Sequence, residues 1–124
     1  MSNDWLDDAL IRGPLYCLCK SKKEFKRKLK ETGLPKSLWP KFISDGADAT
    51  THILETDSSR TMCIVCIGGV NPDRVDQLLV HEAVHVWQEA LDVLKETEPS
   101  CEFQAYAIQR IYQELADAYY GGGE

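Results

Sequence analysis

The sequence lacks any apolar run long enough to cross a lipid bilayer. Its first ten residues, MSNDWLDDAL, are acidic and lack both the basic start and the apolar stretch of a secretory signal. It contains no internal repeat and no low-complexity linker, and only the terminal GGGE is rich in glycine. We therefore expect one domain over residues 1–124, a cytoplasmic location and no membrane partner.

Disulfide-forming cysteines are not expected either, because the five cysteines are odd in number and no secretion signal accompanies them. Cys17-x-Cys19 and Cys63-x-x-Cys66 have spacings that suit a four-thiolate zinc site. However, Cys63 and Cys66 lie in TMCIVCIGG, which is typical of a strand, and residues three apart on a strand point to opposite faces. We predict reduced thiols that pack as small apolar side chains.

The net charge of −6 is unevenly distributed along the chain. Residues 1–42 carry ten Lys and Arg against five Asp and Glu, whereas residues 43–124 carry four against fifteen. Such a basic segment either contacts nucleic acid or an acidic partner, or forms a solvated helix that balances the acidic remainder. We favour the solvated helix and do not expect nucleic acid as a partner. Stacking on bases requires several aromatic side chains, and residues 20–30 contain only Phe25.

Helices are predicted for the basic part of the chain. A short helix is expected over residues 4–11. A second helix begins at Ser21, which forms a capping box with Glu24, and ends at Gly33. Residues 1–42 are thus predicted to form a basic helical segment.

The remaining core, residues 49–119, is predicted to begin with a hairpin over residues 49–67. Its two strands, 49–57 and 61–67, are rich in Thr, Ile and Val and are separated by the turn-forming sequence DSSR. A helix over 71–94 opens with an Asn cap and a Pro, a polar break follows, and a last long helix covers 99–119. This order predicts an α+β fold with a small antiparallel or mixed sheet packed on two helices.

The motif HEAVH, residues 81–85, carries the strongest chemical indication. On a helix, His81 and His85 lie one turn apart on the same face, so both imidazoles can reach one metal ion. Glu82 projects about 100° around the helix, which suits contact with a metal-bound water rather than with the metal. Zinc lowers the pKa of such a water to about 7, and a carboxylate beside it can take the proton and pass it to a leaving amine.

The setting of the motif supports ligand roles for the histidines. His85, Gln88 and Asp92 fall within about 40° of His81 on a helical wheel. Apolar residues fill the opposite arc: Val75, Leu79, Ala83, Val86, Ala90 and Leu94, extended by Val80, Trp87 and Leu91. A histidine of the core belongs in that apolar arc, whereas a metal ligand belongs on the polar remainder.

A catalytic zinc usually has a third protein ligand, and Glu102 is the best candidate. It follows His85 by 17 residues, after the polar break, so an antiparallel return of the last helix can bring it to the histidines. The alternative is a first-turn glutamate favoured by the helix dipole. Asp92, Cys101 and His52 are rival ligands.

These residues resemble a known family. HEAVH followed by Glu102-Phe-Gln-Ala105-Tyr106 is similar to the gluzincin branch of the zincin metallopeptidases. The resemblance covers residues 60–119 and implies a minimal zincin-like fold, with His81, His85 and Glu102 as zinc ligands and Glu82 as the catalytic base. HEAVHVWQ with EFQAYAIQ is also similar to small metallopeptidase-like proteins of phages and prophages, for which the host cytoplasm is the expected location.

The sequence departs from larger thermolysin-like members at Tyr106, where those proteins have an aspartate, and in having no histidine after His85. Tyr106 can hydrogen-bond a ligand or a catalytic oxyanion, or it can simply pack. The predicted function is a zinc-dependent metallopeptidase acting on a polypeptide. The alternative is a non-catalytic zinc-binding module that binds a protein partner, as in phage particle assembly.

The zincin resemblance also implies a strand that borders the substrate cleft and pairs with substrate backbone. Residues 61–67 are the candidate, with an ordinary central strand as the alternative. A chain of 124 residues leaves little room for a second lobe, so we expect a shallow, open cleft.

Overall fold

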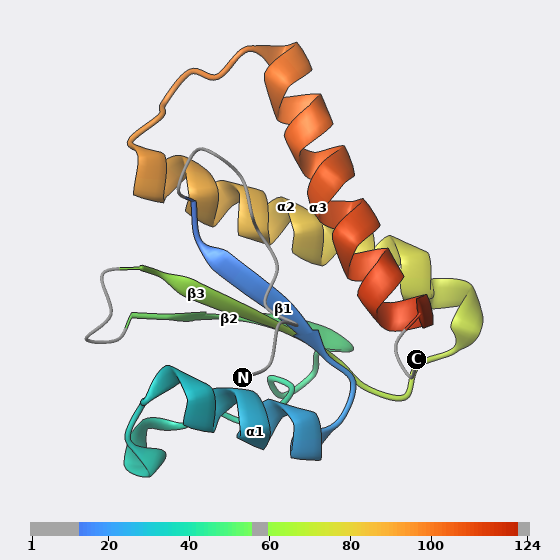
Figure 1. Cartoon of the computed structure of the whole chain (residues 1–124). Helices are drawn as coiled ribbons and strands as arrows, with labels where there is room; N and C mark the ends of the chain where they lie inside the picture. Colours follow the sequence, from blue (N-terminus) through green and yellow to red (C-terminus); the bar gives the residue numbers. More distant parts are fainter. Residues whose placement is uncertain (1–12, 56–59, 122–124) are drawn as a thin grey trace.

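The computed structural model describes residues 13–55 and 60–121. In these ranges a three-stranded mixed sheet packs against three helices, of which the two C-terminal ones are long. Helix α1 covers one face of the sheet, and α2 and α3 lie on the other side (Figure 1). The α+β class predicted from the sequence is therefore confirmed, while the helix expected over residues 4–11 falls outside the described residues.

The sheet has the order β1-β3-β2. Strand β2 (Ala49–Leu54) pairs antiparallel with β3 (Met62–Ile67), which confirms the predicted hairpin. Strand β1 (Leu15–Cys19) pairs parallel with β3 and was not predicted, so the expectation of a wholly helical N-terminal segment is wrong. The sequence LYCLC shows no clear polar alternation, and its partner strand lies far along the chain, so no local pattern marks it.

Strand β3 is the centre of the fold, because its side chains fill two separate cores. Cys63 and Val65 pack toward α2 and α3, whereas Ile64 and Cys66 pack toward α1. The prediction that Cys63 and Cys66 point to opposite faces is confirmed. All five cysteines are free thiols, and only Cys101 is exposed.

Helix α1 (Lys22–Thr32) begins and ends at the predicted residues. The Ser21 hydroxyl accepts from the backbone N–H of Glu24 at 3.2 Å, and Gly33 ends the helix with a φ of 80°. The Glu24 carboxylate accepts from the N–H of Lys20 at 2.8 Å, one residue before the position that a capping box requires. A short 3-10 helix, η1 (Lys36–Leu38), follows α1.

Helix α2 (Val75–Leu94) packs its apolar arc on the sheet. A 3-10 turn, η2 (Pro72–Arg74), precedes it, and the Asn71 side chain accepts from the N–H of Asp73 at 2.9 Å. The arc is buried as predicted at Val75, Leu79, Ala83, Val86, Trp87 and Ala90. Val80, expected to extend the arc, is 44% exposed.

Helix α3 (Cys101–Gly121) returns across α2 (Figure 1). Its buried residues, Ile111, Leu115 and Ala116, all lie in its second half. The Tyr16 hydroxyl of β1 also donates to the Glu114 carboxylate there. None of the helices in the described ranges has the length and apolar character needed to span a membrane.

Candidate metal centre

The two histidines of HEAVH face each other on the outer side of α2. The Nε2 atoms of His81 and His85 are 3.2 Å apart, and the ring planes cross at 78°. His81 is exposed and His85 is half-buried, so the pair is open to solvent. The prediction that both imidazoles converge from the polar side of the helix is confirmed.

Gln88 contacts the outer ring nitrogen of His85, the one that faces away from His81. The Gln88 carbonyl oxygen lies 3.1 Å from Nδ1 of His85 and can accept a hydrogen bond from its N–H. In the tautomer that carries its proton on Nδ1, His85 has a lone pair on Nε2 that can accept from the Nε2–H of His81. Such a partner on the outer nitrogen is what orients histidine ligands in metal sites.

The spacing of the two nitrogens matches half of a tetrahedral zinc site. Two Zn–N bonds of about 2.05 Å at a tetrahedral angle separate their nitrogens by about 3.3 Å. The separation between Nε2 of His81 and Nε2 of His85 is 3.2 Å. One zinc ion can therefore take the place of the proton between the two Nε2 atoms with little rearrangement. The two imidazoles would then occupy two of the four coordination positions of that ion.

Glu82 is buried between α2 and the sheet, with an exposed fraction of 3%. Its carboxylate accepts a hydrogen bond of 2.6 Å from the hydroxyl of Thr51 on β2. Buried carboxylates need such partners because an unpaired one loses its hydration without compensation. The place of Glu82 beside a metal-bound water stays a prediction, whereas the structure shows its carboxylate held by Thr51 of the sheet.

Glu102 does not join the histidine pair. In the part of the chain that the structure describes, no group of three His, Cys, Asp or Glu side chains is placed to hold a metal ion. The predicted antiparallel return does occur, but α3 begins on another side of α2. The Trp87 indole N–H donates to the Gln104 carbonyl oxygen at 2.8 Å, and Trp87 lies about 120° around α2 from His81.

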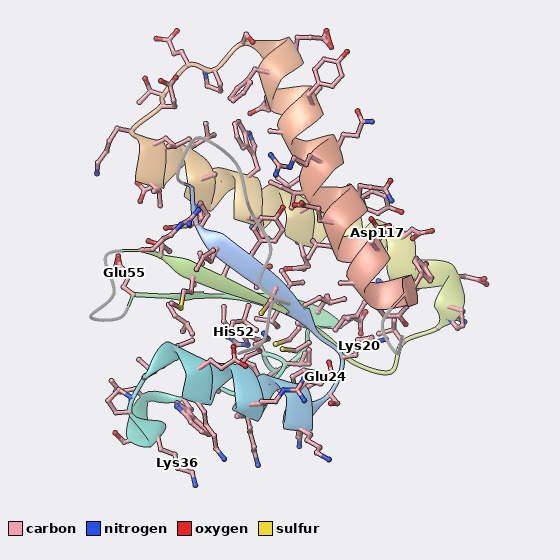
Figure 2. All side chains as sticks on the ribbon, viewed as in Figure 1. Lys20, Glu24, Lys36, His52, Glu55 and Asp117 are labelled. Carbon is pink, nitrogen blue, oxygen red and sulfur yellow. The ribbon has the colours of Figure 1, made fainter. Side chains whose placement is uncertain are left out.

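Within the described residues, the rival ligands Asp92, Cys101 and His52 do not complete a three-member site with the pair either. Tyr106 is 64% exposed, so it does not pack in a core. His52 lies on the α1 side of the sheet, where Nε2 is 2.9 Å from the Phe42 carbonyl oxygen (Figure 2). The residues present thus fit a two-histidine metal site and do not complete the predicted three-ligand site.

Glu89, which follows His85 by one helical turn, was not among the predicted site residues. Burial first, and then the charges of Asp92 and Glu55, raise the pKa of Glu89. Glu89 follows the buried Glu82 by seven residues, so it lies on the same side of α2, the side that faces the sheet. Its spacing of four residues from His85 was the pattern that could have indicated that Glu89 lies near the motif.

The strand beside the motif also differs from the one expected. Residues 61–67 form the central strand β3, whereas β2 is one of the two edge strands and carries the Thr51 bond to Glu82. Among the strands of the described residues, the one that presents an unpaired edge beside the HEAVH helix is therefore β2. The alternative that residues 61–67 form an ordinary central strand is confirmed.

No family model, curated protein or solved structure matches this chain.

Proposed function

We propose that the chain is a zinc-dependent metallopeptidase of a minimal zincin-like kind, in which His81 and His85 hold the metal ion. The observation that carries the proposal is the separation of 3.2 Å between the two Nε2 atoms on an open helix face. Zinc bound there would polarise a peptide carbonyl and acidify a water molecule. Glu82, oriented by Thr51, is the general base for that water.

The third ligand in this proposal is Glu102. It stands in the first turn of α3, whose first half contains no buried residue. Contacts of Trp87 with Gln104 and Phe103 hold that half against α2. Glu102 can reach the histidines only if the first turn of α3 gives up these Trp87 contacts, and we propose that metal binding compensates for their loss and draws Glu102 toward the pair.

A non-catalytic zinc-binding module is the second candidate function. It is favoured by the burial of Glu82 and its bond to Thr51, because a base engaged with the protein is less available to a water molecule. In that case the histidine pair holds the metal as a structural staple, and a protein partner takes the place of a peptide substrate.

Calorimetric titration of the metal-free chain with zinc tests the site. We expect His81→Ala and His85→Ala each to weaken binding at least about 100-fold, since loss of an outer partner alone costs 10–100-fold. His52→Gln is the matched control, because this third histidine contacts Phe42 and Phe25 instead. Equal zinc affinity in all three variants would contradict the site.

Hydrolysis separates the two candidate functions. With casein or a mixed fluorogenic peptide library, Glu82→Gln should keep zinc and lose cleavage. A Glu82→Gln variant that cleaves at the parental rate removes Glu82 as the base. A parental chain that binds zinc without any cleavage supports the structural module instead.

Glu102→Ala tests the third ligand. The matched control is Glu98→Ala, which also removes one exposed carboxylate. Zinc affinity should fall only in the first variant. If both variants bind zinc as the parent does, Glu102 is not a ligand.

A further inference from the structure

A groove of about 520 Å³ lies on the opposite side of the molecule, between α1 and the segment that follows η1. Phe25 and Leu29 of α1 form its apolar floor, Trp39 and Phe42 line it from the neighbouring segment, and Lys22 and Lys26 also border it. This volume is within the range of small-ligand sites. The groove thus combines aromatic rings with positive charge.

Hydrogen bonds fix the aromatic side of this groove. The Trp39 indole N–H donates to the carbonyl oxygen of Leu34 at 2.8 Å. Nε2 of His52, which stacks on Phe25, lies 2.9 Å from the carbonyl oxygen of Phe42. Figure 2 shows His52 between the sheet and α1. These bonds hold the Trp39 ring and the backbone at Phe42 in place, so a ligand that stacks there does not have to order the segment.

Positive charge continues along α1 beyond the groove. Lys22, Lys23, Lys26, Arg27 and Lys30 are exposed, and within residues 13–55 and 60–121 no carboxylate lies within ion-pair distance of them. The eleven residues of α1 give this row a length of about 16 Å. Nitrogen-tipped side chains accordingly project from α1 away from the sheet in Figure 2.

We propose that the groove and the cationic surface of α1 bind single-stranded nucleic acid. A base stacks against Trp39 or Phe42, and the phosphates contact Lys22, Lys26 and the cations beyond them. Non-specific single-strand binding has these two components, a cationic track for the backbone and aromatic platforms for the bases. The sequence argued against nucleic acid because α1 contains one aromatic residue, but the fold adds two rings from residues 39–42.

One observation excludes a small ligand, and another favours nucleic acid over an acidic protein. The cations extend beyond the groove, and a single small anion would leave them unused, whereas a polyanion contacts them along its length. The groove itself offers flat rings, which stack on bases and are not needed to bind carboxylates. The acidic half of a second copy of this chain could pair with the cations but would not use the aromatic rings. The test must therefore distinguish self-association from nucleic-acid binding.

Fluorescence anisotropy of the full chain with a labelled twelve-nucleotide oligo-dT tests the proposal. The charge reversals Lys22→Glu and Lys26→Glu, made together, should weaken binding at least tenfold. They should also reduce the slope of log affinity against log salt by about 1.4, for two phosphate contacts. The matched control is Lys95→Glu with Arg110→Glu, which changes the net charge equally on the other side of the sheet and should stay within twofold of the parent.

An abasic oligomer with the same number of phosphates tests the aromatic part. We expect it to bind at least fivefold more weakly than oligo-dT, because it has no base to stack. Equal affinity for the two oligomers, or no binding of oligo-dT at low salt, would overturn the proposal. A dimer in gel filtration that dissociates on the Lys22 and Lys26 reversals, without oligonucleotide binding, would overturn it in favour of self-association.

Discussion

Replacing Thr51 by valine removes the hydroxyl that donates to the buried Glu82 carboxylate. Valine keeps the shape of threonine, so the loss is mainly that of a charge-assisted hydrogen bond, which measures 2.6 Å. Because Glu82 is only 3% exposed, water does not readily replace the donor. Leaving a buried charged acceptor unpaired costs about 2–3 kcal/mol. For a chain of 124 residues this lowers Tm by about 10 °C.

Urea denaturation followed by circular dichroism at neutral pH measures this loss, and an unchanged slope would show that the unfolded state is unaffected. Thr51→Ser retains the hydroxyl and should recover most of the stability. Thr61→Val is the matched control, because the Thr61 side chain makes no hydrogen bond within the described residues. If the Thr51 and Thr61 valine variants differ by less than about 0.5 kcal/mol, the reasoning about Glu82 is refuted.

Three further predictions concern thiols, tyrosines and a carboxylate. A thiol reagent should modify only Cys101 in the native chain and all five cysteines after denaturation; rapid native reaction of more than one thiol would contradict the burial of the others. The hydrogen bond to Asp76 raises the pKa of Tyr120 to about 12, so ultraviolet titration of Asp76→Ala should show a midpoint nearer 10. Burial, and then Asp92, raise the pKa of Glu89 above 4.5, so stability is lost as the pH rises through the folded-state pKa. Glu89→Gln should therefore raise Tm by about 2 °C at neutral pH and leave it unchanged below pH 4; the opposite pH trend would refute this.

Local features were predictable from the sequence. The cap at Ser21, the left-handed Gly33 and the Asn71 cap depend on interactions between near neighbours. The convergence of His81 and His85 follows from helix geometry alone. Each of these needs only a few consecutive residues, which is why the chain pattern was sufficient.

Features that depend on distant contacts were not predictable. Strand β1 is defined by pairing with β3, and LYCLC does not distinguish a strand from another apolar segment. The position of Glu102 depends on which side of α2 receives α3, and the bond between Trp87 and Gln104 decides that. The spacing of 17 residues between His85 and Glu102 allows α3 to return along α2, but it does not specify which side of α2 receives α3.

The basic and acidic parts of the sequence lie apart in the folded chain, because α1 and α2 pack on opposite faces of one sheet (Figure 1). Helix α1 contains six Lys and Arg, whereas α2 contains four acidic residues and none that are basic. These two helices therefore place charges of opposite sign on the two faces of the sheet. A polyanion is attracted to the α1 face and repelled by the α2 face, so the histidine pair stays accessible while the α1 face is occupied.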